Sequence, residues 1–282
     1  MKHGFLQLRD GRKVRFPAVM GILNVTPDSF SDGGRHLEVR QGVARALEME
    51  AAGASIIDIG GESTRPGACE VSVDEELARV IPLIGKLAPR LNAPISIDTR
   101  KAAVADAALA AGAAIVNDVS GLEFDAAMAG VVARARAAVV IMHMRGTPAT
   151  MMRKTRYRNV VEEVIAALGE RVRRAIEAGI SRARIIIDPG LGFAKRPVHS
   201  LRLLGAIPRL SEMGYPVLIG ASRKSFVRAA AGTDETSQMF GTAAACAIAI
   251  AGGAAIVRVH DPAPAAAVVR MAAAVARAAI GS

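Results

Sequence analysis

The chain has 282 residues and a formal net charge of +10, with 51% apolar and only 3% aromatic residues. Its length suits one domain of about 250 residues with small additions, and its apolar fraction suits a large core. A chain without tryptophan and with two tyrosines lacks a base-stacking platform, so no nucleic-acid partner is expected. The basic residues are scattered, and we interpret the following arginines as solvated helix faces: Arg134, Arg153, Arg171, Arg209 and Arg270.

Cysteine usage and hydropathy predict the compartment. Cys69 and Cys246 form no CxxC pair, which argues against a disulfide framework or a zinc site and favours the reducing cytoplasm. The opening residues turn polar at once, so no secretory signal is expected. The longest apolar stretch, at about residues 241–257, is shorter than the roughly 20 residues that span a bilayer and holds two adjacent glycines. We interpret it as a buried helix followed by a strand, and expect no membrane partner.

A hairpin is the first predicted element, at residues 5–16. Leu6 and Leu8 alternate with polar neighbours before an Asp-Gly turn, and Val14 and Phe16 do so after it. The apolar face of this hairpin is expected to cover the floor of the domain that follows. We therefore predict an N-terminal hairpin at residues 1–17 and a single domain at residues 18–282, without a linker.

From residue 18 onward, short apolar runs repeatedly end in a polar residue and precede a helical pattern. Eight such units predict an α/β fold, a single (β/α)₈ TIM barrel, in which the carboxyl ends of the strands meet at one mouth. One surrounding helix is predicted from the apolar stripe of Val161, Ile165, Leu168, Val172 and Ile176. The expected strands lie at residues 19–23, 54–60, 94–97, 113–116, 138–142, 185–187, 216–220 and 255–257.

Polar residues that follow these runs form the candidate site. A lone aspartate at a strand end can bind a ligand or can bond to loop backbone, and the residues alone leave both alternatives open. Arg258 and His260 can likewise bind an anion or form an ion pair at the rim. His143 fits an orienting or core histidine and is assigned no site role. The candidates at the strand ends are Asn24, Asp98, Asn117, Asp188, Lys224, Arg258 and His260.

Two loops carry further signals. Residues 24–34, NVTPDSFSDGG, are too polar and glycine-rich for a helix and hold one aromatic residue, Phe30, which either closes as a lid or packs on the rim. Residues 60–67, GGESTRPG, combine glycines that permit close backbone approach with Thr64 and Arg65, which can donate to an anion.

A family resemblance rests on eight stretches. The chain contains, in this order, MGILNVTPDSFSDGG, DIGGESTRPGA, SIDT, VNDVSGL, MHMRG, IDPGLGF, GASRKSF and VRVHD. Together they resemble the dihydropteroate synthase family over roughly residues 18–275; the first two stretches and SRKS are the most specific. The resemblance implies a transferase of folate biosynthesis. It would condense 6-hydroxymethyl-7,8-dihydropterin pyrophosphate with 4-aminobenzoate to 7,8-dihydropteroate and pyrophosphate, by an SN1-like displacement.

The resemblance implies three groups of binding residues. Asn24, Arg258 and His260 would hold the pyrophosphate, with Mg²⁺ at Asn24. Asp98, Asp188, Lys224 and Arg258 would be catalytic. The pterin would contact Asp98, Asn117, Met142, Asp188, Phe193 and Lys224. The 4-aminobenzoate would contact Phe30, Thr64, Arg65, Pro66 and Ser225.

Inhibitor binding and assembly also follow from the resemblance. No insertion stands beside Pro66, where sulfonamide-insensitive relatives carry one, so sulfonamides are expected to bind. A homodimer is implied, formed by the apolar helices expected at residues 238–252 and 263–280. Residues 194–200 depart from the family pattern, which commonly has a glycine and then an asparagine there.

Three alternative functions make different demands on the same residues. A methyltetrahydrofolate:corrinoid methyltransferase would share the aspartates and the asparagine but has no use for the SRKS and ESTRPG stretches. A metal-dependent barrel hydrolase needs a histidine cluster, whereas the first strand ends Asn24-Val25-Thr26. A non-catalytic paralogue that binds pterin or a partner protein stays open, although the intact anion-binding residues argue against it.

Overall fold

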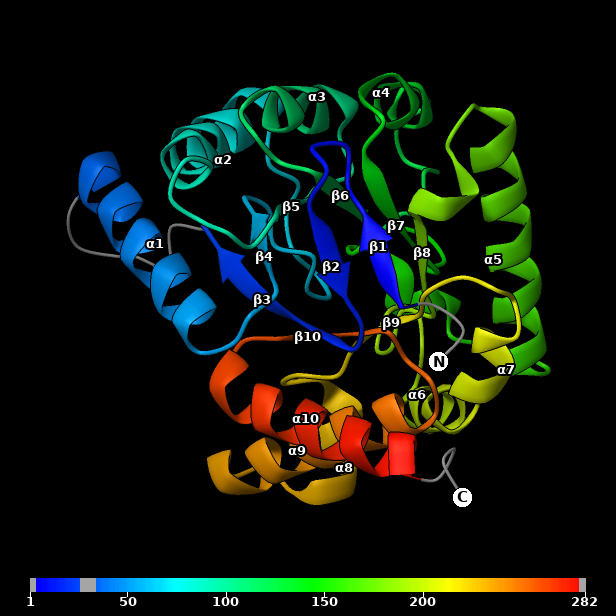
Figure 1. Cartoon of the computed structure of the whole chain (residues 1–282). Helices are drawn as coiled ribbons and strands as arrows, with labels where there is room; N and C mark the ends of the chain where they lie inside the picture. Colours follow the sequence, from blue (N-terminus) through cyan, green and yellow to red (C-terminus); the bar gives the residue numbers. More distant parts are fainter. Residues whose placement is uncertain (1–3, 26–33, 279–282) are drawn as a thin grey trace.

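The computed structural model describes residues 4–25 and 34–278. The strands of its main sheet are β3 (Ala18–Asn24), β4 (Ile56–Gly60), β5 (Ile95–Asp98), β6 (Ile115–Asp118), β7 (Ala138–Met142), β8 (Ile185–Asp188), β9 (Leu218–Gly220) and β10 (Ile256–Val259). They pair in parallel in the order β8-β7-β6-β5-β4-β3-β10-β9, and a bridge between Ile187 and Val217 joins the two ends. Helices surround the strands as an outer ring (Figure 1). The predicted TIM barrel is confirmed.

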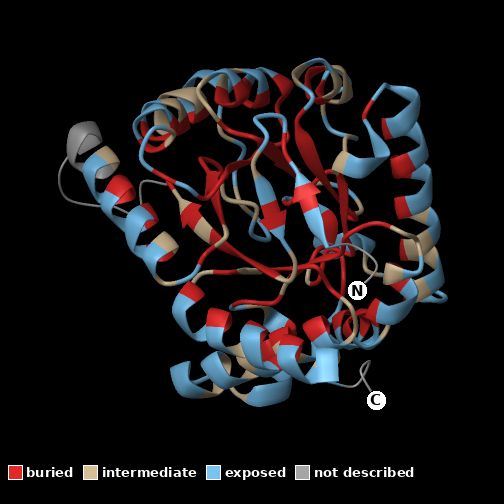
Figure 2. Cartoon of the chain, in the orientation of Figure 1, coloured by how far each residue is buried: buried red, intermediate tan, exposed pale blue. Residues whose placement is uncertain are grey.

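The strands are apolar because both of their faces are covered. Side chains of β5, β6, β7 and β8 are buried throughout, since the helices cover one face of the barrel and the barrel interior covers the other. Figure 2 shows this as buried strands inside a ring of helices whose outer faces are exposed. All eight predicted strands therefore lie where an apolar run predicted them.

The helices follow the strands around the barrel. They are α1 (Gly34–Ala51), α2 (Val73–Leu87), α3 (Ala102–Ala110), α4 (Met128–Ala135), α5 (Val160–Glu177), α6 (Pro197–Gly205), α7 (Ile207–Ser211), α8 (Ser225–Ala231), α9 (Glu235–Ala251) and α10 (Pro262–Ala278). Local signals set their starts: the side chain of Ser72 accepts the backbone N–H of Glu75 at the start of α2, where acidic residues follow. No helix within the described residues is long and apolar enough to cross a membrane.

Two sequence interpretations of helix faces are corrected. On α5 the buried stripe runs through Leu168 and Val172 as predicted, but Ile176 is 40% exposed. Arg171, interpreted as solvated, is instead buried and donates to the carbonyl oxygens of Met142 (2.6 Å) and Met144 (2.9 Å). The helix turns Arg171 inward because these two carbonyls at the end of β7 need a donor.

The helix α9, expected to be buried, is buried on one side only. Cys246 and Ala249 face the core, whereas Phe240 is 65% and Ile248 is 52% exposed. The uncharged sequence therefore reflects two apolar faces, one packed on the barrel and one open.

The N-terminal hairpin closes one end of the barrel. Strands β1 (Phe5–Gln7) and β2 (Lys13–Arg15) pair antiparallel with Leu6 opposite Val14. These two side chains and Leu8 are buried in one cluster with residues at the amino ends of the strands, including Ile115 and Ile186. Figure 1 shows the hairpin across the middle of the ring. The prediction that it covers the floor is confirmed, and the carboxyl ends of the strands form the opposite mouth.

Strand register aligns the candidate residues at that mouth. Across the neighbouring strands β3, β4, β5 and β6, Asn24 pairs with Gly60, Gly60 with Asp98, and Asp98 with Asn117. These residues therefore form one continuous row, in which the position of Gly60 carries no side chain that would separate its two neighbours.

Candidate active site at the barrel mouth

A single arginine organises one side of the mouth. Arg258 of β10 donates from Nε to Oδ2 of Asp58 and from Nη2 to Oδ2 of Asp98, both at 2.6 Å. The Nδ2 of Asn117 donates to the same Asp58 oxygen at 3.0 Å. Arg258 therefore points inward between two buried carboxylates, which excludes the alternative of a surface ion pair at the rim.

Sequence analysis missed Asp58. It lies inside the apolar run of β4, opposite Ser96, and is fully buried. The sequence prediction rests on the residues that follow each apolar run, and Asp58 stands within one. The signal was nevertheless present, because a carboxylate in the middle of a buried strand requires a partner of opposite charge.

Two carboxylate oxygens in this group have no partner within the described part of the chain. They are Oδ1 of Asp58 and Oδ1 of Asp98, and both are buried. Burial raises the pKa of Asp98, which the nearby Arg258 opposes and the Asp58 carboxylate reinforces. Buried polar atoms of this kind normally have a donor, so the free Asp98 oxygen at the mouth is suited to a ligand N–H.

The opposite side of the mouth holds Asp188 and Lys224. Oδ1 of Asp188 accepts the backbone N–H of Gly190 at 2.7 Å, so the alternative of bonding to loop backbone holds for one of its two oxygens. Lys224 Nζ lies 4.1 Å from the centroid of the Phe193 ring. Burial raises the pKa of Asp188 to about 6 and lowers the pKa of Lys224 to about 8. At neutral pH this side therefore presents a carboxylate and an ammonium group.

The pH dependence of pterin use should follow these two groups together with Asp98, whose pKa burial raises to about 7. Below the pKa of about 6 Asp188 gains a proton and can no longer accept two ring donors, and above the pKa of about 8 Lys224 loses its charge. We expect kcat/KM for the pterin substrate to fall on both sides, because this parameter reports the free enzyme. A flat profile from about pH 5 to pH 9 would contradict the assignment, and Lys224→Arg should move the alkaline limb upward.

A buried lysine joins the loops after β7 and β8. Lys195 is 1% exposed, and its Nζ lies 2.9 Å from the carbonyl oxygen of Phe193 and 3.2 Å from that of His143. It also lies 3.0 Å from Nδ1 of His143. Burial lowers the pKa of Lys195 and of His143 well below their usual values, so the histidine is neutral. His143 is therefore a buried structural residue, and sequence analysis missed Lys195 altogether.

Hydrogen bonds fix residues 194–200, the segment that departs from the family pattern. Oγ of Ser200 accepts the backbone N–H of Gly192 at 3.0 Å, and Nδ1 of His199 accepts that of Arg196 at 3.3 Å. Gly192 has φ +83°, and a Cβ there would lie 3.3 Å from the Cδ of Lys224. The hydrogen bond to Ser200 thus fixes the loop that lies against Lys224.

Three predicted pyrophosphate residues lie around the same mouth. Asn24 ends β3, and its Oδ1 lies 3.8 Å from the point that a Cβ at Gly60 would occupy. Nδ1 of His260 lies 3.0 Å from Oγ of Ser222. Burial, assisted by the nearby Arg223 and then Arg258, lowers the pKa of His260 to about 4, so its imidazole is neutral and offers one N–H.

Four of the five predicted benzoate residues belong to the described part of the chain. Thr64 is half-buried, whereas Arg65 and Pro66 are exposed in the β4 loop (residues 61–72). Ser225 is the first residue of α8, directly after Lys224. Within residues 4–25 and 34–278, none of these four side chains bonds to the carboxylates below, and Phe30 lies outside the described residues.

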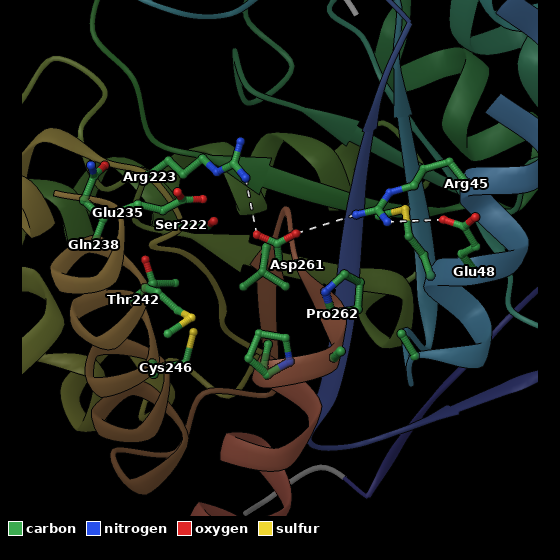
Figure 3. Close-up of a pocket in the computed structure, with 18 residues that line it drawn as sticks. Arg45, Glu48, Ser222, Arg223, Glu235, Gln238, Thr242, Cys246, Asp261 and Pro262 are labelled. Carbon is green, nitrogen blue, oxygen red and sulfur yellow. Dashed lines mark hydrogen bonds and ion pairs between the residues drawn. The ribbon is translucent and has the colours of Figure 1, made fainter. Parts of the chain in front are cut away.

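A cavity of about 520 Å³ lies beside this site, between α1, α9 and the start of α10 (Figure 3). The carboxylate of Asp261, which belongs to the lining, forms ion pairs with Arg223 at 3.3 Å and with Arg45 at 3.6 Å. Cys246 lines its wall as a free cysteine, and burial raises the pKa of that thiol to about 12. Its lining contains none of the predicted pterin residues, but it includes Ser222, which contacts His260 of the mouth.

Comparison with known proteins identifies the family. The family described as pterin binding enzyme matches residues 20–260. The dihydropteroate synthase of Synechocystis sp. is 48% identical over 244 residues, which cover 86% of this chain and 84% of that protein. Two solved structures each align with 96% of this chain and 98% of their own. The Yersinia pestis dihydropteroate synthase with a sulfonamide drug complex has TM-score 0.90 at 39% identity, and the Xanthomonas albilineans enzyme with 4-aminobenzoic acid has TM-score 0.89 at 44% identity. The chain therefore belongs to the pterin-binding enzyme family and, within it, to the dihydropteroate synthases.

Proposed function

We propose that this chain condenses 6-hydroxymethyl-7,8-dihydropterin pyrophosphate with 4-aminobenzoate, giving 7,8-dihydropteroate and pyrophosphate. The observation that carries the proposal is the group of buried charges at the mouth, in which one Asp98 oxygen has no partner among the described residues and Asp188 stands beside Lys224. A flat heterocycle with several N–H donors and ring acceptors would satisfy these groups together. Because the chain belongs to the pterin-binding enzyme family, we propose that this heterocycle is a pterin.

In this proposal the pterin lies across the mouth. Asp188 accepts the ring amino group and the adjacent ring N–H, and Lys224 donates to ring acceptors. Asn117 and Asp98 take the remaining polar edge. Phe193 and Met142 cover the ring faces; they belong to one small apolar cluster at the mouth. A ring system with another donor pattern would leave a buried polar group unpaired and would be rejected.

The pyrophosphate is proposed to lie toward Asn24, His260 and the free edge of Arg258. Two of the three guanidinium nitrogens of Arg258 bond to carboxylates, and Nη1 has no partner in the described ranges, so it can reach the anion. His260 adds a neutral N–H, and a bound anion would raise its pKa from about 4.

The residues at the mouth fit a Mg²⁺ ion that binds together with the pyrophosphate. No cluster of three metal-binding side chains is present among the described residues. Mg²⁺ keeps several waters and is commonly held by one or two protein oxygens together with phosphate oxygens, and the amide oxygen of Asn24 fits that role. When bound, the ion would neutralise charge on the departing pyrophosphate. Chelation should abolish turnover, with recovery on adding Mg²⁺; full activity under chelation would contradict the assignment.

The protein side chains support departure of the leaving group before attack. Asp98 and Asp188 favour the positive charge that develops on the pterin methylene, while Arg258 and His260 favour the anion that leaves. Such preorganised charges are effective because they need no rearrangement during the reaction. The aniline nitrogen of 4-aminobenzoate is already a neutral nucleophile, so no general base is required. Its ring would lie between Phe30 and Pro66, with its carboxylate near Ser225 and its edge toward Thr64 and Arg65.

Sulfonamides should inhibit the enzyme by competing with 4-aminobenzoate. The β4 loop has no insertion beside Pro66, and the Yersinia pestis relative was solved with a sulfonamide drug complex. Initial rates at varied 4-aminobenzoate should give a competitive pattern. Inhibition constants more than about 100 times the KM for 4-aminobenzoate, a difference of two powers of ten in affinity, would contradict the prediction.

A homodimer is proposed through α9 and α10, which pack side by side at the edge of the barrel (Figure 1). Phe240 on α9 and Met271 on α10 are 65% and 66% exposed, an unusual exposure for large apolar side chains. Sedimentation equilibrium should give twice the chain mass of 29.3 kDa. Phe240→Asp combined with Met271→Asp should give monomers, whereas Val198→Asp, at an exposed site on α6, should not; a monomeric wild type would refute the proposal.

A reducing cytoplasmic setting is also proposed. Cys69 is exposed and Cys246 buried, and both are free thiols. Thiol titration of unfolded protein from its native source should find both cysteines reduced, and a stable intermolecular disulfide at Cys69 would argue against this setting.

The reaction itself is the direct test of function. Purified protein with Mg²⁺ and both substrates should form 7,8-dihydropteroate and pyrophosphate in equal amounts. A folded protein that binds the pterin pyrophosphate and forms neither product would instead be a non-catalytic pterin-binding paralogue.

A further inference from the structure

A buried network of four charges lies directly behind the β4 loop. Glu62 is 8% exposed, and its carboxylate lies 2.5 Å from Nη2 of Arg100 and in contact with Nζ of Lys101. Lys101 also lies 2.6 Å from the carboxylate of Glu76, which is fully buried on α2. Two acids and two bases thus balance one another away from solvent.

This network connects the β4 loop to the strand that carries Asp98. Arg100 and Lys101 follow Asp98 by two and three residues, on the segment that leaves β5. Arg100 also stacks on the ring of Phe124, with its Cζ 4.3 Å from the ring centroid. Glu62 is therefore paired with a segment that is itself held by strand β5 and by the contact of Arg100 with Phe124.

Two hydrogen bonds fix the loop backbone on either side of Glu62, at Gly61 and at Gly67. At the start of the loop, the carbonyl of Gly61 accepts Nη1 of Arg79 at 2.7 Å, and a Cβ on Gly61 would lie 2.9 Å from Val80. In the middle of the loop, the N–H of Gly67 donates to the carbonyl of Pro148 at 3.2 Å. Between these points, Glu62 is the side chain that joins the loop to the buried interior, immediately before the residues assigned to the benzoate.

From this arrangement we infer that Glu62 is a positioning residue, which holds the β4 loop in the conformation that binds 4-aminobenzoate. The inference rests on the proposed function for the identity of that ligand. A buried ion network is a poor way to gain stability alone, because desolvation offsets much of the attraction. Its directional contacts do, however, define one backbone position for residues 63–66, and small displacements of a substrate wall reduce catalysis strongly.

Glu62→Gln and Glu76→Gln form a matched pair of variants. Each removes one negative charge beside Lys101 with almost no change of shape, but only Glu62 belongs to the loop. We expect Glu62→Gln to raise the KM for 4-aminobenzoate by about tenfold or more, with the KM for the pterin substrate unchanged. Glu76→Gln should leave both constants within about threefold, even where it lowers thermal stability equally. Equal effects of the two variants, or parallel changes in both KM values, would overturn the inference.

Two further measurements keep the test decisive. Where a single variant fails to fold, the double variants Glu62→Gln/Lys101→Met and Glu76→Gln/Lys101→Met replace it. Each loses one negative and one positive charge. The two should show the same contrast in the KM for 4-aminobenzoate. Hydrogen exchange at the backbone amides of residues 63–65 needs no activity and should be faster in the Glu62 variant than in the Glu76 variant. An inactive wild type with this exchange contrast would refute the proposed function and retain the loop anchor; equal exchange would refute the anchor.

Discussion

Replacing Asp188 with asparagine should lower kcat/KM for the pterin pyrophosphate by about a thousandfold, the range seen when one preorganised polar group is removed from an active site. Oδ1 of Asp188 already accepts the N–H of Gly190. The asparagine would keep its oxygen there and turn its amide N–H₂ toward the ring. Two pterin donors would then face a donor, and each buried unpaired group costs about 1–3 kcal/mol. Steady-state kinetics and equilibrium pterin binding measure the effect.

Asp118→Asn is the matched control for this variant. Asp118 is equally buried at the end of β6, but its carboxylate accepts the N–H groups of Ser120 at 2.7 Å and Leu122 at 3.0 Å. It holds the loop and does not face the mouth, so pterin affinity should change by about threefold at most. If both asparagine variants bind pterin as tightly as the wild type, Asp188 is not the pterin carboxylate.

Replacing Arg258 with methionine should reduce both stability and turnover. Asp58 and Asp98 would be left buried without their shared cation, and removing one partner of a buried ion pair costs about 3–5 kcal/mol. Turnover should fall by about 10²- to 10³-fold, because the same guanidinium is proposed to stabilise the leaving pyrophosphate. Urea unfolding gives the first effect and kcat at saturating substrates gives the second.

The double variant Arg258→Met/Asp58→Asn separates the two effects. It removes one charge of each sign, leaving Asp98 as the remaining carboxylate of the pair. Stability should recover in part, whereas turnover should stay low. Recovery of turnover along with stability would show that Arg258 serves the fold and has no direct part in the reaction.

The barrel and the row of polar residues at its mouth could be predicted for a physical reason. In a closed parallel sheet both faces of each strand are covered, so each strand is a continuous apolar run that stands out from the sequence. The run ends where the strand meets the mouth, and a polar residue there marks that end of the strand. This is why Asn24, Asp98, Asn117 and Asp188 were found, each as the last or next-to-last residue of its strand.

The buried charges that support the site could not be found in this way. Asp58 lies within a run, Arg171 within the apolar face of a helix, and Lys195 in a loop. A single sequence does not distinguish a solvated lysine or arginine from one whose partners are backbone carbonyls supplied by distant loops. The partners of Arg171 are 27 and 29 residues away, and those of Lys195 include a residue 52 positions earlier.

The residues expected around the benzoate could be predicted least from physical patterns in the sequence. Thr64, Arg65 and Pro66 lie in the β4 loop, where conformation is set by few contacts, and Phe30 falls outside the described residues. The contact of Thr64, Arg65 and Pro66 with 4-aminobenzoate stays a prediction. The Glu62 network is the structural feature that links this side to the core.

A crystal structure with bound pterin pyrophosphate would test the assignment of the mouth most directly. The account predicts the ring between Met142 and Phe193, with Asp188 accepting two ring donors and the unpaired Oδ1 of Asp98 receiving a third. A pterin bound in the cavity beside α9, or a ring at the mouth that makes no contact with Asp188, would contradict it.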